Sequence, residues 1–150
     1  MQSDLRASLE LEEFLPYRLS VLANRVSSAL SGRYAEEFSM SAAEWRVMAA
    51  LGSSDGLSAR EVCLRTAMDK VQVSRAVASL VDSGRVVRRT DAEDGRVTRL
   101  TLSAHGRMVY EEIVPRAKEF EVRLVLVLTA DELESLDVIL EKLTRAVVSL

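Results

Sequence analysis

The sequence is short of the residues that build metal and redox sites. Among its 150 residues it has one cysteine, Cys63, and one histidine, His105. A single cysteine cannot form an internal disulfide, and one thiol with one imidazole cannot supply the three or four soft ligands of a zinc site. We therefore expect no metal and no cofactor. We expect Cys63 to be a buried, inert thiol on a short helix rather than a redox sensor.

Long apolar runs and enzyme motifs are also missing. No stretch of about 18 apolar residues exists, and residues 1–5 lack the basic and apolar regions of a signal peptide, which predicts a cytoplasmic protein without membrane contact. Phosphate-binding glycine loops, dinucleotide fingerprints and nucleophile elbows are absent, so we expect no enzymatic activity. The 48% of hydrophobic and 29% of charged residues are typical of a globular protein. At this length, residues 1–150 are expected to form a single domain.

Charge is distributed unevenly along the chain. The net charge of −3 is unusual for a nucleic-acid-binding protein. Residues 58–99, however, hold nine basic and six acidic side chains, a net charge of +3, and the remaining residues together carry −6. A basic centre therefore lies between acidic ends, and it is this centre that can meet a polyanion.

Capping boxes mark three helix starts, because a hydroxyl side chain followed three positions later by glutamate can satisfy free N–H groups of the first turn. Asp69 with Gln72 can cap a further helix in the same way. The apolar spacing after Pro16 and the stop at Gly84 supply other boundaries, and Pro115 is expected to disturb the helix that contains it. The three boxes are Ser41 with Glu44, Ser58 with Glu61, and Thr129 with Glu132. Helices are predicted over about 16–38, 42–51, 59–65, 69–84, 103–128 and 129–150.

The period of apolar residues changes from 3.6 to 2 after Gly84. Two alternating runs, 85–90 and 97–102, flank a polar tip at 91–95 that contains a glycine. This pattern predicts a β-hairpin, and a hairpin that follows two helices joined by a short turn is a wing. The expected fold is mainly α with a small β-wing: a winged helix-turn-helix lobe at about 41–102, with dimerisation helices at about 11–38 and 103–150.

The last predicted helix has a seam of apolar residues that needs a partner surface. Two terminal helices beside a small lobe have little core of their own to cover. We therefore expect the first, fifth and sixth helices to pair with a second copy of the chain, with packing inside one chain as the alternative. The seam residues are Leu133, Leu136, Leu140, Leu143 and Val147.

Residues 69–89, followed by Asp91, Asp94 and Arg96, resemble the recognition helix and wing of the MarR (multiple antibiotic resistance regulator) family. The order of elements from about Leu11 to Leu150 also agrees with that family. The chain departs from the pattern at Glu93, where the first wing arginine is common, so one arginine remains at the tip. The resemblance implies a homodimeric transcriptional regulator that binds double-stranded DNA.

A recognition helix in the major groove presents its N-terminal residues to base edges. Gln72 can bond adenine, and Arg75 can bond guanine or a phosphate, whereas Arg96 at the wing tip can enter a minor groove. The arginines 88, 89 and 99 are expected to touch phosphates or to pack on the wing. Helical spacing is expected to turn Val71, Ala78, Leu80 and Val81 toward the core. The predicted DNA-binding set is Lys70, Gln72, Val73, Ser74, Arg75, Arg88, Arg89, Asp94, Arg96 and Arg99.

The resemblance also implies an effector site between the dimerisation helices and the DNA-binding lobe. Aromatic acids are common effectors of the family, so the expected ligand is a small aromatic acid, phenol or thioester that releases a repressor from DNA. The alternatives are a regulator without an effector and a winged-helix module that binds proteins. The candidate ligand residues are Tyr17, Arg18, Trp45, Arg46 and Met48. The opposing interpretation places Trp45 and Met48 in the core and the arginines on the surface.

Overall fold

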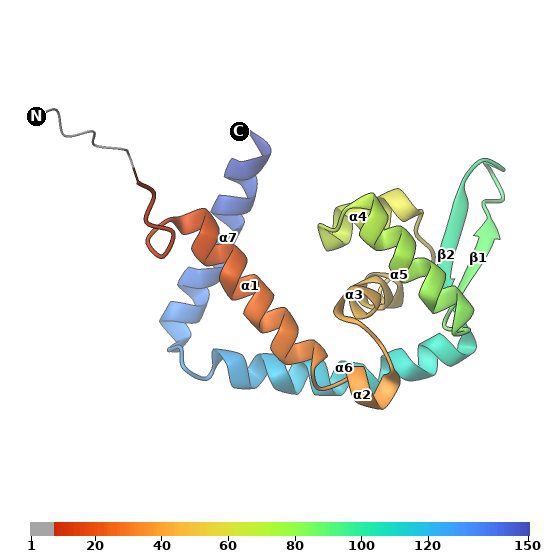
Figure 1. Ribbon diagram of the computed structural model, residues 1–150, viewed down its shortest axis with the longest axis horizontal. Helices are drawn as coiled ribbons and strands as arrows, with labels where there is room; N and C mark the ends of the chain where they lie inside the picture. The colour runs from red at the N-terminus through yellow and green to blue at the C-terminus, as the bar shows by residue number, and fades with distance from the viewer. Residues whose placement is uncertain (1–7) are drawn as a thin grey trace, which may run out of the picture. The chain divides into compact units, whose positions relative to one another are not determined.

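The computed structural model describes residues 8–150, and within them the chain forms seven helices and two strands (Figure 1). Contacts divide it into two compact units, one that ends at Glu111 and one that runs from Glu112 to Leu150. Each unit is described by itself. Residues 1–5, in which no signal peptide was predicted, lie outside the described residues.

The first predicted helix is in fact two helices. α1 spans Leu15–Ser31, with Pro16 in its first turn, and α2 spans Ala35–Phe38. The prediction of one continuous helix through Phe38 is wrong because the chain turns between them and buries Tyr34, which is 1% exposed. The Tyr34 ring lies 6.2 Å from the ring of Trp45, centroid to centroid. Because Trp45 lies on the helix α3, Ala42–Gly52, the burial of Tyr34 depends on a segment outside the predicted first helix.

Three helices, each opened by a predicted capping box, form the helix-turn-helix lobe. In every box the cap side chain accepts an N–H from the third helical residue, whose own side chain accepts the cap N–H. Three helix starts are thus confirmed, because capping depends on neighbours in sequence. Their shared core includes Val47, Met48, Leu51, Val62 and Leu80. The helices are α3 (Ala42–Gly52), α4 (Ala59–Thr66) and α5 (Lys70–Asp82).

The predicted wing is an antiparallel hairpin of β1, Val86–Thr90, and β2, Thr98–Leu102 (Figure 1). The edge of β2 that faces away from β1 forms an isolated β-bridge that the sequence did not predict. Leu57, just before α4, exchanges two backbone hydrogen bonds with Leu100, at 3.1 and 2.8 Å. This bridge attaches the base of the wing to the helix-turn-helix.

Two long helices complete the chain: α6, Ala104–Val125, and α7, Ala130–Val148. The helix assignment of α6 is continuous through Pro115, where we expected a disturbance. The predicted capping box of Thr129 and Glu132 opens α7, and α7 has no buried residue. Mainly helical structure with a small two-stranded wing confirms the predicted fold class. Within residues 8–150, no helix is long and apolar enough to cross a membrane.

Candidate DNA-binding surface

The capping box of α5 uses the side chain of a predicted base contact. The backbone N–H of Gln72 donates to the Asp69 carboxylate at 2.8 Å, and the Gln72 side-chain oxygen accepts the Asp69 N–H at 3.3 Å. A glutamine needs both its amide oxygen and its amide nitrogen to pair with an adenine edge. Gln72 must therefore leave the capping box before it can read adenine in this way.

One face of α5 packs in the core, and the opposite face is exposed. The assignment of Val73 to the DNA-binding set is wrong, because Val73 is 1% exposed and belongs to the buried stripe. The assignment of Val71 and Ala78 to the core is wrong as well, because both are exposed. At 3.6 residues per turn, Val71 lies about 200° around the helix from Val73. The buried stripe is Val73, Ala76, Val77 and Leu80; the exposed positions include Lys70, Val71, Gln72, Ser74, Arg75 and Ala78.

A groove lies between α5 and the wing, with a volume of about 350 Å³. Two of the predicted cations, Lys70 from α5 and Arg88 from β1, line it together with the hydroxyl group of Ser74. None of its lining residues is acidic, so two positive charges share one concave surface. Such a surface attracts the phosphate backbone of nucleic acid. We call it the wing groove; its other lining residues are Ala59, Val73, Val77, Thr98 and Leu100.

Strand register separates the two neighbouring arginines of β1. Arg88 lies opposite Leu100, and Arg89 lies opposite Arg99. Since successive residues of a strand point to opposite faces, only Arg88 faces the wing groove. Arg89 is exposed on the other face of the hairpin. The two side chains therefore cannot play the same part in binding.

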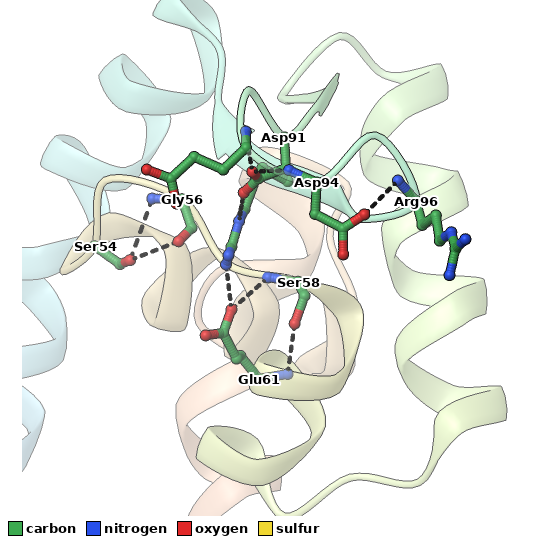
Figure 2. A network of polar contacts seen from close by, with 9 residues as sticks. Ser54, Gly56, Ser58, Glu61, Asp91, Asp94 and Arg96 are labelled. Atoms are coloured by element: carbon green, nitrogen blue, oxygen red, sulfur yellow. Dashed lines mark hydrogen bonds and ion pairs between the residues drawn. The ribbon is translucent and has the colours of Figure 1, made fainter.

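Arg99 is held by two carboxylates and is not a free cation. Its guanidinium donates to Asp91, at the wing end of β1, and to Glu61 on α4, each at 2.7 Å. Glu61 is also the third helical residue in the capping box of α4, and its side chain accepts the N–H of the cap residue Ser58 (Figure 2). The two ion pairs favour the expectation that Arg99 packs on the wing, and its contact with DNA stays a prediction. Arg99 links the wing to the start of α4.

The same hydrogen bonds fix the charge state of Asp91. The bond from Arg99, with N–H donors of Asp94 and Glu93, lowers the pKa of Asp91 to about 2. The pKa of Glu61 is lowered too, mainly by its bonds from Ser58 and then by Arg99. A lowered carboxyl pKa contributes stability that is present above the ordinary pKa and lost as pH falls through the lowered value. The carboxylates of Asp91 and Glu61 therefore stay ionised, and keep their bonds to Arg99, between pH 5 and 8.

Asp94, a member of the predicted DNA-binding set, forms hydrogen bonds within the wing tip. Its carboxylate accepts the backbone N–H of Arg96 at 3.0 Å, and its own N–H donates to Asp91 at 3.0 Å. The side chain of Arg96 points away from this network into solvent (Figure 2). A carboxylate would also repel phosphate, so its turn-forming bonds are the physical reason for Asp94 at this position.

The structure divides the predicted ligand residues into three groups. Tyr17 and Arg18 line a groove on α1, whereas Trp45 and Arg46 line a different one on α3. Met48 is fully buried in the core, so its assignment to a ligand wall is wrong. The sequence could not separate these sites, because the packing of α3 against α1 decides which face of α3 is accessible to a ligand.

The groove that contains Trp45 lies against the end of α1 and has a volume of about 480 Å³. Arg46 and Arg65 both line it, and the Arg46 guanidinium donates to the hydroxyl of Ser27. Within the described residues, neither arginine pairs with a carboxylate. Sequence reasoning missed Arg65, because its distance from Arg46 along the chain gave no signal. We call this site the α1–α3 pocket; its lining also includes Leu30, Ser31, Ala42, Ala49, Ala50, Ser53 and Thr66.

Within residues 8–150, no group of three or more histidine, cysteine, aspartate or glutamate side chains is placed to hold a metal ion. Cys63, expected to be buried, is half-buried. The lobe thus carries the basic wing groove beside the exposed face of the capped helix α5. A capped second helix, a short turn before it and a basic wing together define a winged helix-turn-helix DNA-binding protein.

Comparisons with known proteins point to the same class of DNA-binding regulator. The sequence profile of the MarR family matches residues 38–97. An HTH-type transcriptional repressor of Mycobacterium tuberculosis is 28% identical over 131 residues, which cover 87% of this chain and 91% of that protein. The structure of a MarR/EmrR family regulator from Acinetobacter sp. ADP1 has a TM-score of 0.87 and 25% identity, covering 95% and 100% of the two chains.

BpsR of Bordetella bronchiseptica, whose DNA binding is regulated by 6-hydroxynicotinic acid, has a TM-score of 0.79 and 23% identity, covering 91% and 97%. These matches support a DNA-binding transcriptional regulator of the MarR type. The matched family and relatives are regulators of transcription and not enzymes.

Proposed function

We propose that this regulator is a homodimeric repressor that binds a pseudo-palindromic operator through α5 and the wing. The observation that carries the proposal is the wing groove, where Lys70, Ser74 and Arg88 converge without a carboxylate. The DNA-binding lobe is assigned to about 41–102, and the dimerisation helices to about 11–38 and 103–150. The similarity to a transcriptional repressor supports the sign of regulation.

The proposed contacts follow from exposure and charge. Ser74 and Arg75 face the major groove from the exposed side of α5. In the wing groove, Lys70 and Arg88 contact the phosphate backbone of one DNA strand. Arg89 meets phosphates from the other face of the wing, and Arg96 enters the minor groove. Asp94 and Arg99 hold the wing in shape.

Unpartnered apolar faces support the dimer. Neither α1 nor α7 contains a buried residue, although both are amphipathic and 17 and 19 residues long. A helix with an apolar stripe is stabilised when another surface covers the stripe, and a symmetric copy can do this for both helices. The exposed apolar side chains include Leu15, Leu19 and Leu22 on α1, Val122 and Leu124 on α6, and Val138, Ile139, Leu140 and Val147 on α7.

Binding of two chains per operator is the first expected result. Two symmetric recognition helices require half-sites about 34–36 Å apart, which is one turn of the duplex. Sedimentation of the protein with a selected duplex measures the stoichiometry, and footprinting measures the spacing. One chain per duplex, or a footprint without two-fold symmetry, would rule out the dimer; no retardation of any duplex at low salt would favour a protein-binding winged helix.

The α1–α3 pocket is the proposed effector site. Its volume of about 480 Å³ suits a small ligand. Trp45 supplies an aromatic wall, and Arg46 and Arg65 can pair with a carboxylate. The regulation of BpsR by an anionic aromatic acid supports a ligand of this class. Tyr17 and Arg18, which line a separate groove on α1, are the competing site.

An aromatic acid is expected to lower operator affinity by about 5- to 150-fold, a coupling of about 1–3 kcal/mol. The experiment titrates hydroxybenzoates, hydroxycinnamates and their thioesters against a preformed complex while the fluorescence of Trp45, the only tryptophan, is recorded. Arg65→Gln should weaken the response, whereas the matched control Arg18→Gln should preserve it. The reverse result would move the site to α1, and binding of no compound would favour a regulator without an effector.

A further inference from the structure

Val71 is an exposed apolar side chain at the start of the recognition helix. It is 58% exposed, although the helix already has a complete buried stripe on its other side. Valine is not favoured at an exposed helix position, because its branched Cβ loses rotamer freedom there. Neither core packing nor helix propensity therefore accounts for valine at this position.

The neighbours of Val71 are all candidates for contact with DNA. Ser74 and Arg75 follow it by three and four residues, so the three side chains form one exposed stripe on α5. Lys70 and Gln72 flank Val71 in the first turn. The N-terminal residues of a recognition helix are the ones that reach base edges, so Val71 lies at the end of α5 that enters the groove.

We propose that Val71 reads thymine, through contact between its methyl groups and the C5-methyl group of the base. This inference rests on the proposed DNA-binding surface. Among the four bases, only thymine presents an apolar group in the major groove, and a small apolar side chain is its complement. The contact removes the valine methyl groups and the thymine C5-methyl group from water. Cytosine at the same position would instead place a polar amino group against the valine.

The experiment first selects an operator from a pool of random duplexes with the full-length protein. Each thymine of the selected duplex is then replaced in turn by uracil, which removes the C5-methyl group and nothing else. Wild-type protein is expected to lose about fourfold in affinity at one thymine per half-site, the effect of one methyl group leaving an apolar contact. Fluorescence anisotropy measures each affinity.

Variants assign the effect to the side chain. Val71→Ala is expected to reduce the difference in affinity between the thymine and uracil duplexes at that position, because alanine is shorter and removes less methyl surface from water, and Val71→Thr is expected to keep part of the difference. The matched control is Leu64→Ala, which shortens another exposed apolar side chain, 74% exposed on α4, and should keep the full difference. Both positions are exposed, so folding is preserved.

Two results would overturn the assignment while the proposed function stands. One is an operator at which no thymine methyl matters to the wild-type protein, and the other is a Val71→Ala variant with undiminished sensitivity to uracil. A protein that selects no sequence from the pool would overturn the proposed DNA-binding surface and the reading of thymine together.

Discussion

Arg75→Ala is expected to weaken binding to the cognate operator by about 1–3 kcal/mol, or about 5- to 150-fold, and to affect random duplexes much less. Arg75 lies on the exposed stripe of α5, and within the described residues no ion pair holds it. A guanidinium in this place can donate two hydrogen bonds to a guanine edge, an interaction that other bases cannot replace. Anisotropy titrations with operator and random DNA, repeated at several salt concentrations, measure the difference.

Arg89→Ala is the matched control, because it removes the same charge from the wing face that lies away from the wing groove. Loss of a phosphate contact should weaken operator and random DNA alike and should lower the slope of log affinity against log salt by about one. If both variants reduced binding to the two duplexes equally, the division between reading bases and holding phosphates would be wrong.

Gly106→Ala is expected to destabilise the protein by about 1–3 kcal/mol or more. A Cβ atom at Gly106, in the first turn of α6, would lie 1.9 Å from the backbone carbonyl oxygen of Arg85. That carbonyl is fixed, since it also accepts the N–H of Ser103 at 3.0 Å. Alanine normally favours a helix over glycine by up to about 1 kcal/mol, so the clash must exceed this gain. Thermal and urea unfolding measure the change.

Gly95→Ala provides the control for this substitution. At Gly95 in the wing tip, no atom lies within 4 Å of an added Cβ, and the backbone is not in the left-handed region. Its stability should change by no more than about 0.5 kcal/mol, as at other open surface positions. A Gly106→Ala variant as stable as Gly95→Ala would mean that α6 does not approach Arg85 as closely as described.

Local signals in the sequence predicted most of the elements. The boxes at Ser41, Ser58, Asp69 and Thr129 placed four helix starts correctly, because a cap involves only residues three positions apart. The change of period after Gly84 likewise predicted the hairpin. The first helix was predicted too long, since the burial of Tyr34 against Trp45 depends on a contact between distant segments.

The sequence by itself determined the fold class, the helix starts, the wing and the basic centre, because capping, periodicity and charge are properties of neighbouring residues. Tertiary structure alone decided which side chains of these elements are available. It buried Val73 and exposed Val71, it placed Arg99 between Asp91 and Glu61, and it brought Arg65 beside Arg46. The physical reason is that burial and ion pairing depend on which faces of separate elements meet, and spacing along one element cannot specify its neighbour.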